Sequence, residues 1–251
     1  MRRRIRVLGV VVAAGIGAGG LSACDPKSAS TFEDDASVSG KIRAVRLDSG
    51  SGGVTLRGGK GAGKVSVHRS VEYKGDRPEK ATHRVEGGVL VLGGCGEDCA
   101  VNYTVELPAG LPVSGQTANG PVSLSDVGAV NVTTSSGTVA LDGVAGAVDV
   151  RTTNGRITGR RLRGGSVAAR TTNGPIELTP AVALDIRAKT SNGTIALTVP
   201  TGPYQVSAHV SNGHKYIDVP DDPHGAHRLD LTTSNGTVTV KTAKTVKTAG
   251  P

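Results

Sequence analysis

The sequence predicts an all-β protein, a single-domain β-solenoid in which short strands stack as coils. Apolar residues alternate with polar ones, as in Val148, Val150 and Thr152, which is typical of strands with one buried face. A corner motif, Thr/Ser-x-Asn/Ser-Gly, recurs at spacings of 17, 18, 19, 19, 20 and 23 residues. The chain has one Phe and no Trp, so small branched side chains must fill a narrow interior. The corner glycines are Gly120, Gly137, Gly155, Gly174, Gly193, Gly213 and Gly236.

An antiparallel β meander is the alternative architecture, and it would use each Asn-Gly as a hairpin turn. A solenoid would use each Asn-Gly as the corner of one coil, so that equivalent residues stack at ~4.8 Å and form ladders. Only in the solenoid do equivalent residues of successive units lie side by side, so only there does their repetition stabilise the fold. We therefore favour the solenoid. The predicted Asn ladder consists of Asn154, Asn173, Asn192, Asn212 and Asn235. The corner threonines Thr152, Thr171 and Thr190 are predicted to face the lumen.

Residues 1–23 have the form of a lipoprotein signal peptide. Four arginines (Arg2, Arg3, Arg4 and Arg6) precede an apolar stretch of 14 residues, which is short for a membrane span of ~20. The following "LSAC" resembles a lipobox, so we expect Cys24 to be lipidated (palmitate) and to hold the protein at the extracytoplasmic face of the cell membrane. An ordinary secretory signal with a chance cysteine is the alternative.

Removal of the signal lowers the net charge from +8 to +4, because it carries four arginines and no acid. The remaining charge does not suggest a nucleic-acid partner.

The rest of the chain divides into three parts. Residues 24–40 are predicted to be the lipidated cysteine and a polar tether, residues 41–240 the solenoid, and residues 241–251 a disordered basic tail. Strand-like stretches such as "GKVSVHRSVEYKG" are expected to form irregular N-terminal coils. The unit around Gly213 has two extra residues before Ile217, which predicts a bulge or a protrusion.

Cys95 and Cys99 are predicted to form a disulfide, because no second Cys/His pair follows at a zinc-site spacing and an exported protein meets oxidising conditions. Four histidines, His209, His214, His224 and His227, lie near Asp221 and Asp222. Imidazole and carboxylate together suit zinc. We interpret the segment as a solvated loop instead, since no regular element fixes its geometry, and we expect no metal site and no cofactor.

The passage "YTVELPAGLPVSGQTANGPVSLSDVGAVNVTTSSGTVALDGV", followed by Asn-Gly coils, resembles the bacterial putative-adhesin domain family of unknown function. Its markers here are Pro108-Ala109-Gly110 after a Tyr-containing strand, then Ser/Asn-Gly corners. The resemblance covers about residues 40–240. It implies an exported or membrane-attached repeat protein and brings no catalytic residues.

Two hypotheses about function remain open. The first is a non-catalytic surface binding or scaffold module, and the alternative is a solenoid enzyme acting on cell-envelope polysaccharide. Such an enzyme needs carboxylates at a fixed separation. The outward acids Asp149, Glu177, Asp185 and Asp218 do not share a stacked position, so we favour the binding module.

A row of cations is the candidate binding site. Arg151, Arg170 and Lys189 precede the corner threonines of successive coils, His209 is expected in the next coil, and Arg187 shares their face. Stacking at ~4.8 Å would cost about 1 kcal/mol per pair in water. The row predicts a site for a linear polyanion of the cell envelope, and a solvated basic face is the alternative. The oligomeric state is left open.

Overall fold

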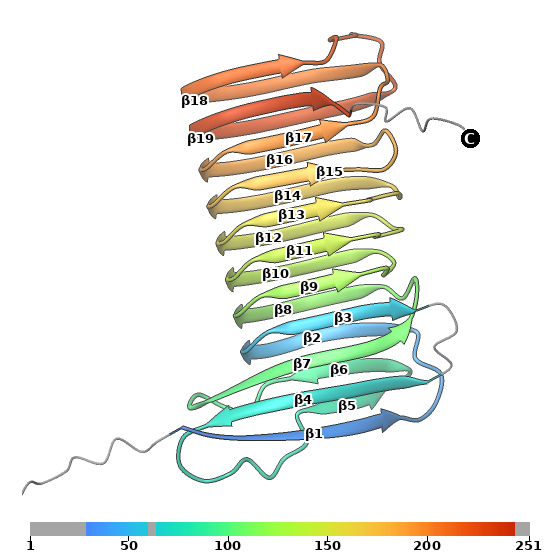
Figure 1. Ribbon diagram of the computed structural model, residues 1–251, viewed down its shortest axis with the longest axis vertical. Coiled ribbons are helices and arrows are strands. Elements are labelled where there is room, and N and C mark those ends of the chain that lie inside the picture. Colours follow the sequence, from blue (N-terminus) through green and yellow to red (C-terminus); the bar gives the residue numbers. More distant parts are fainter. Residues whose placement is uncertain (1–28, 60–63, 244–251) are drawn as a thin grey trace, which may run out of the picture.

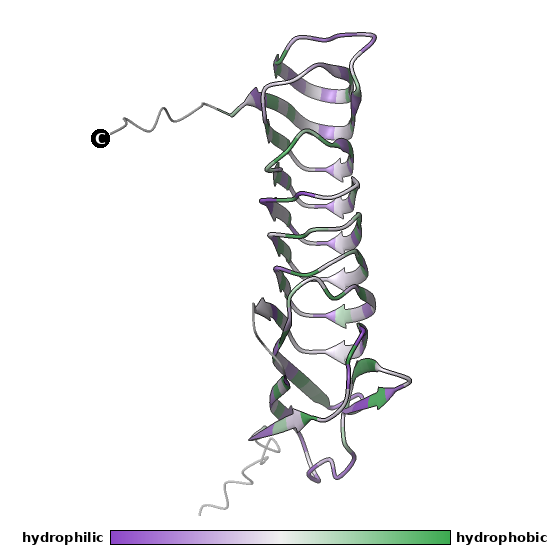
Figure 2. Cartoon of the chain, turned by 90° about the vertical axis from the view of Figure 1, so that its right-hand side faces the viewer, coloured by the Kyte–Doolittle hydropathy of each residue, from purple (hydrophilic) through white to green (hydrophobic). Residues whose placement is uncertain are grey.

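The predicted β-solenoid is confirmed. A computed structural model describes residues 29–59 and 64–243, which form strands stacked into a rod (Figure 1). Apolar and polar residues alternate along the coils (Figure 2). In this described part of the chain, no helix is long and apolar enough to cross a membrane.

The strands of the N-terminal half are β1 (Ser30–Val38), β2 (Ala44–Ser51), β3 (Val54–Gly59), β4 (Val65–Tyr73), β5 (His83–Glu86), β6 (Val89–Gly93), β7 (Cys99–Pro108), β8 (Val113–Asn119) and β9 (Val122–Ser125). Those of the C-terminal half are β10 (Val130–Ser136), β11 (Val139–Asp142), β12 (Val148–Asn154), β13 (Ile157–Arg160), β14 (Ser166–Asn173), β15 (Ile176–Thr179), β16 (Asp185–Asn192), β17 (Ile195–Val199), β18 (Tyr204–Asp218) and β19 (His227–Thr242).

Each regular coil has two strands joined at the Asn/Ser-Gly corner. The first strands stack in parallel as one wall, which we call the first wall: β2, β8, β10, β12, β14, β16 and the first half of β19, which pairs with β16. The second strands stack likewise as the second wall. Between the walls, the inward side chains form a core of Val, Leu, Ile and Ala in which Val150, Ala169 and Ile176 are fully buried. Parallel pairing of successive units rules out the meander.

The corner motif holds each coil to the one before it. The buried Thr171 hydroxyl donates to the Gly155 carbonyl oxygen at 3.1 Å, and Thr190 donates to Gly174 at 3.0 Å. A Cβ added at Gly155 would lie 1.9 Å from the Gly137 carbonyl oxygen, so this glycine is required by the close approach of two coils. The corner amides form the predicted ladder, as where Asn173 Nδ2 donates to Asn154 Oδ1 at 2.8 Å.

The order of coils departs from chain order at the C-terminal end. β19 lies between the β16–β17 coil and β18, so Asn192 neighbours Asn235, and Asn212 is the last member of the ladder (Figure 1). All five predicted members of the ladder are present, and at this end they stack in an order that differs from chain order. The predicted bulge or protrusion is absent: β18 pairs continuously with β19, and Lys215 takes the position opposite Val238.

The N-terminal end is a mixed cap rather than irregular coils. β1 and β4 pair antiparallel, as do β4 and β7, and β5 and β6. β6 and β7 then pair in parallel with β2 and β3, so the β2–β3 coil sits between them and β8–β9. Residues 30–38, predicted as tether, form β1 because Phe32, Ala36 and Val38 pack against the core. At the other boundary, β19 reaches Thr242.

Tyr103 anchors this cap. It is buried, and its hydroxyl lies 2.8 Å from the carbonyl oxygens of both Thr82 and Gly93, which can share its one proton. Burial raises the pKa of Tyr103 to about 12. Arg69 binds both carboxylate oxygens of Asp34 at 2.5 and 2.6 Å and donates to the Thr82 hydroxyl at 2.9 Å. These contacts tie β1, β4 and β7 together.

Candidate functional site

The outer surface of the first wall carries most of the cations predicted as a binding site. Arg151 of β12 pairs in register with Arg170 of β14, and Arg170 pairs with Lys189 of β16. Arg187 lies two residues before Lys189 on the same outward phase. The structure therefore brings these four side chains together on neighbouring strands, because the coils stack in register.

His209 does not continue this row. β19 is inserted between β16 and β18, so Thr232 stands next to Lys189, and His209 stands next to Thr232. The expectation that His209 lies in the coil next to Lys189 was wrong, because the repeat units do not stack in chain order at this end.

Carboxylates accompany the arginines. Asp149 accepts from Arg151 Nη2 at 3.1 Å and from Arg170 Nη1 at 3.0 Å, and Asp230 accepts from Arg187 Nε at 2.9 Å. All five side chains are at least partly exposed, so each pair contributes at most about 1 kcal/mol to stability. The acids lower the net charge of this face and fix the direction of the arginines.

Two residues of this face, Arg228 and Asp230, belong to it only because β19 stacks beside β16 in the structure. Arg228 of β19 stands next to Asp185 of β16, whose carboxylate accepts the Arg228 backbone N–H at 2.9 Å. Asp230 opposes Arg187 in register. Sequence reasoning missed both because it placed β18 in the slot that β19 occupies. The Asp149 pairing could have been found, since Asp149 precedes Arg151 by two residues on an outward strand phase.

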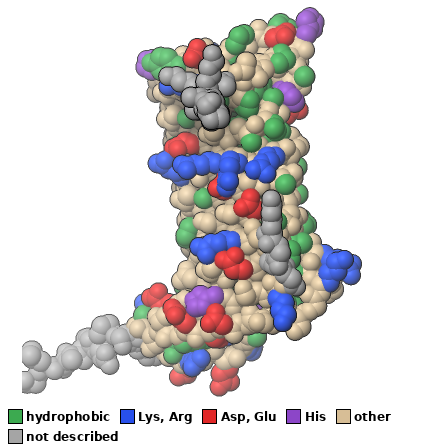
Figure 3. Space-filling model, turned by 45° about the vertical axis from the view of Figure 1, so that its right-hand side comes forward, with side chains coloured by type: hydrophobic (Ala, Val, Ile, Leu, Met, Phe, Trp, Pro, Cys, Tyr) green, Lys and Arg blue, Asp and Glu red, His purple; other side chains and the backbone are tan. Residues whose placement is uncertain are grey.

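Acidic and basic side chains also lie close together on the part of the surface seen in Figure 3. Arg161 binds Asp142 through Nε and Nη2, both at 2.7 Å. The hydrogen bond from Arg161 holds the pKa of Asp142 below its usual value.

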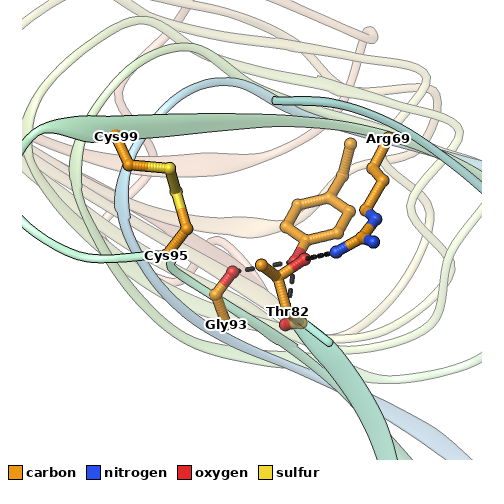
Figure 4. Close-up of a disulfide and its surroundings, with 6 residues drawn as sticks. Arg69, Thr82, Gly93, Cys95 and Cys99 are labelled. Atoms are coloured by element: carbon orange, nitrogen blue, oxygen red, sulfur yellow. Dashed lines mark hydrogen bonds between the residues drawn. A yellow bond between two sulfur atoms is a disulfide. The ribbon is translucent and has the colours of Figure 1, made fainter. Parts of the chain in front are cut away.

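The predicted disulfide is present. Cys95 and Cys99 are bonded, with their Cα atoms 5.7 Å apart, beside the Tyr103 hydrogen bonds (Figure 4). The predicted lipidation site Cys24 lies outside the described residues.

The histidine-rich segment is partly strand. His209 and His214 lie in β18, and His227 begins β19, with its Nδ1 3.6 Å from Asp185 Oδ1. Within residues 29–59 and 64–243, no group of three or more His, Cys, Asp or Glu side chains is arranged to hold a metal ion.

Solved structures with a similar course of the chain have low sequence identity. A "putative cell adhesion protein" from Clostridium sporogenes is 8% identical, with a TM-score of 0.40, covering 85% of this chain and 100% of that one. A "putative adhesin" from Bacteroides fragilis is 12% identical, with a TM-score of 0.41 and coverages of 86% and 99%. One from Parabacteroides distasonis is 11% identical, with a TM-score of 0.46 and coverages of 83% and 96%.

Among curated proteins, none matches the chain. The family model described as Toastrack DUF4097 matches residues 111–246, which include β8 to β19. This match spans more than half of the 251 residues, so the chain belongs to the Toastrack DUF4097 family.

Proposed function

We propose that the protein is a membrane-anchored extracytoplasmic lipoprotein whose solenoid is a non-catalytic binding or scaffold module for an anionic polymer of the cell envelope. The observation that carries the proposal is the in-register stack of the first wall. It repeats the same outward positions at about 4.8 Å intervals. A rigid row of this kind suits a linear partner with repeating charged groups.

The geometry of the rod supports the anchoring. β1 begins six residues after Cys24 and lies at the cap end, whereas β18 forms the opposite end (Figure 1). A lipid on Cys24 would hold the cap near the membrane and direct β18 away from it. The outward-facing side chains of the first wall lie on the side of the rod and would then be exposed to polymers of the cell envelope.

The described carboxyl groups support binding over catalysis. Glycoside hydrolysis needs a general acid, usually a carboxyl group with a raised pKa. The carboxyl groups with displaced pKa values are Asp34, Glu86 and Asp142, and an arginine hydrogen bond lowers each of them. These groups serve the ion pairs of the structure.

Arginine chemistry supports a phosphate-bearing partner. Around β12, β14, β16 and β19, the first wall carries five cations, namely Arg151, Arg170, Arg187, Lys189 and Arg228. Three carboxylates, Asp149, Asp185 and Asp230, lie among them. The surplus is positive, and a guanidinium binds two phosphate oxygens at once.

Binding of the full chain in detergent to purified poly(glycerol phosphate) tests the partner. We expect binding at low ionic strength that weakens with added salt, and loss of binding in the Arg151→Glu, Arg170→Glu double variant with an unchanged circular dichroism spectrum. Absence of binding by the parent at low salt would overturn the polymer proposal. Glycan turnover that a single carboxylate substitution abolishes would decide for an enzyme.

Cell fractionation tests the anchor separately. The Cys24→Ala variant is expected to leave the membrane fraction. Its retention there, as firm as that of the parent, would contradict lipidation of Cys24.

A further inference from the structure

A hollow lies on the outer surface of the first wall, across β14, β16 and β19. Its volume is about 280 Å³, and its lining includes Ser166, Ala168, Arg170, Arg187 and Arg228. Two carboxylates, Asp185 and Asp230, also line it. Three arginines and the small side chain of Ala168 therefore line one hollow.

The hollow exists because Ala168 has only a methyl group. In its outward row, Ala168 stands between Asp149 of β12 and Arg187 of β16. Asp230 of β19 follows Arg187 in the same row. One short side chain between longer neighbours leaves room for the hollow.

The arginines beside the opening are held in position. Arg170 is only one-third exposed (33%), and its Nη1 donates to Asp149 at 3.0 Å. Arg187 donates through Nε to Asp230 at 2.9 Å, and Arg228 donates through Nη2 to Gln205 Oε1 at 3.3 Å. A guanidinium has five N–H donors, so each arginine keeps donors for a ligand beyond these contacts.

We propose that this hollow binds one phosphodiester group of the polymer, seated over Ala168 between the guanidinium groups of Arg170 and Arg187. This inference rests on the proposed function and names the subsite and the ligand class. Phosphate accepts two parallel hydrogen bonds from an arginine fork, and arginines already oriented by carboxylates lose less conformational freedom on binding.

The carboxylates in the lining restrict the ligand. Asp185 and Asp230 would repel a second anionic group placed a few ångströms from the first. A polymer with one negative charge per repeat, such as a polyol phosphate, fits this arrangement better than a densely sulfated chain.

The position along the rod favours a polymer over a lipid headgroup. On the first-wall side, six strand-to-strand steps separate β5 of the cap from β14. At ~4.8 Å per step, the hollow lies about 29 Å from the cap end. This exceeds the Debye length of ~8 Å at physiological salt, so a membrane beneath the cap would exert little electrostatic pull there.

The test is a set of affinities of the full chain in detergent for poly(glycerol phosphate), measured by titration calorimetry at low ionic strength. Ala168→Leu fills the hollow without changing charge, and we expect it to lower the affinity at least tenfold. Ala168→Ser leaves the hollow open and is expected to stay within twofold of the parent. Circular dichroism and the melting temperature check that each variant is folded.

A matched pair of arginine variants separates the subsite from general attraction. Arg170→Gln with Arg187→Gln is expected to lower the affinity at least tenfold. The control, Arg160→Gln with Arg163→Gln, removes the same charge from exposed arginines outside the hollow and is expected to change it less than threefold.

Parental affinity in folded Ala168→Leu, or equal losses in the two arginine pairs, would overturn the subsite while leaving polymer binding by the face intact. Absence of polymer binding by the parent would overturn both proposals. Binding to phosphatidylglycerol vesicles without binding to the polymer would show a membrane ligand and would also contradict both.

Discussion

At the scale of single residues, the three corner positions have separate tasks. The threonine hydroxyl closes a hydrogen bond to the glycine carbonyl of the preceding coil, as Thr171 does to Gly155. The glycine leaves room for that coil, and the asparagine amide extends the ladder on the surface. Each residue type therefore recurs because stacking, and not only turning, requires it.

Gly155→Ala should destabilise the protein. The new Cβ would lie 1.9 Å from the Gly137 carbonyl oxygen, so two coils must separate, at a cost of about 2–3 kcal/mol. Urea unfolding measures the loss. Gly50→Ala is the control, since its Cβ would meet nothing within 4 Å, and we expect a change within about 0.5 kcal/mol. Equal stability of the two variants would contradict close coil packing as the reason for the glycine.

Asp34→Asn should weaken the N-terminal cap at neutral pH but not in strong acid. The hydrogen bond from Arg69 holds the pKa of Asp34 below its usual value. The folded state therefore favours the charged form, so this contribution is present above the unfolded pKa and is lost as pH falls through the folded pKa. Because Asp34 is 38% exposed, we expect a loss of about 1–2 kcal/mol at pH 7.

Urea unfolding of parent and Asp34→Asn at a series of pH values measures this. The two stabilities should converge as the pH falls below the folded pKa of Asp34. A gap that is equally wide at every pH would mean that the carboxylate charge does not stabilise the cap.

At the scale of elements, β18 ends the rod, and its inward-facing residues are less buried than those of the other coils. Val206, Ala208 and Val210 are only partly buried, whereas Leu229 and Leu231 of β19 are fully buried. Lys215 stands opposite Val238, at an inward position, and its Nζ donates to the Ala208 carbonyl oxygen at 3.3 Å. A charge at an inward position of an edge strand discourages pairing with another chain.

Lys215→Ile should increase self-association. The change makes the open end of the rod apolar and removes a charge that opposes stacking of two ends. Sedimentation velocity over a concentration series is expected to show larger species than in the parent. Lys241→Ile makes the same exchange at an exposed position of β19 and should sediment like the parent. If the Lys215 variant also sediments like the parent, the lysine does not protect this end.

The sequence predicts strands and register well, because alternation fixes which side chains face inward and the corner motif fixes where coils align. It does not predict which coil neighbours which, since all units present nearly the same pattern. Packing decides that β19, and not β18, lies beside β16. Leu229 and Leu231 of β19 fill the core of an interior coil, whereas Lys215 of β18 is tolerated at the open end of the rod. The acidic partners of the arginines depend on that order. The pairing of Asp149 with Arg151 could be predicted from the sequence, whereas the pairing of Asp230 with Arg187 could not.

At the scale of the whole molecule, one continuous stack runs from the cap at β1 to the end strand β18 (Figure 1). The insertion of β19 beside β16 places Asp230 against Arg187 and completes the lining of the hollow with Arg228. The order in which the last coils stack therefore determines which charged side chains line the hollow. A change in the order of the last coils would remove Arg228 and Asp230 from the proposed phosphate subsite while leaving Arg170 of β14 and Arg187 of β16 unchanged.

Engineered cysteines in a Cys24→Ser background test this stack most directly. Asn192 and Asn235 occupy adjacent coils, about 4.8 Å apart, within the Cα separation that a disulfide needs, whereas Asn192 and Asn212 are about twice as far apart. Mass spectrometry after mild oxidation is expected to find a disulfide in Asn192→Cys with Asn235→Cys and none in Asn192→Cys with Asn212→Cys. Bonding of the second pair in place of the first would contradict the stack.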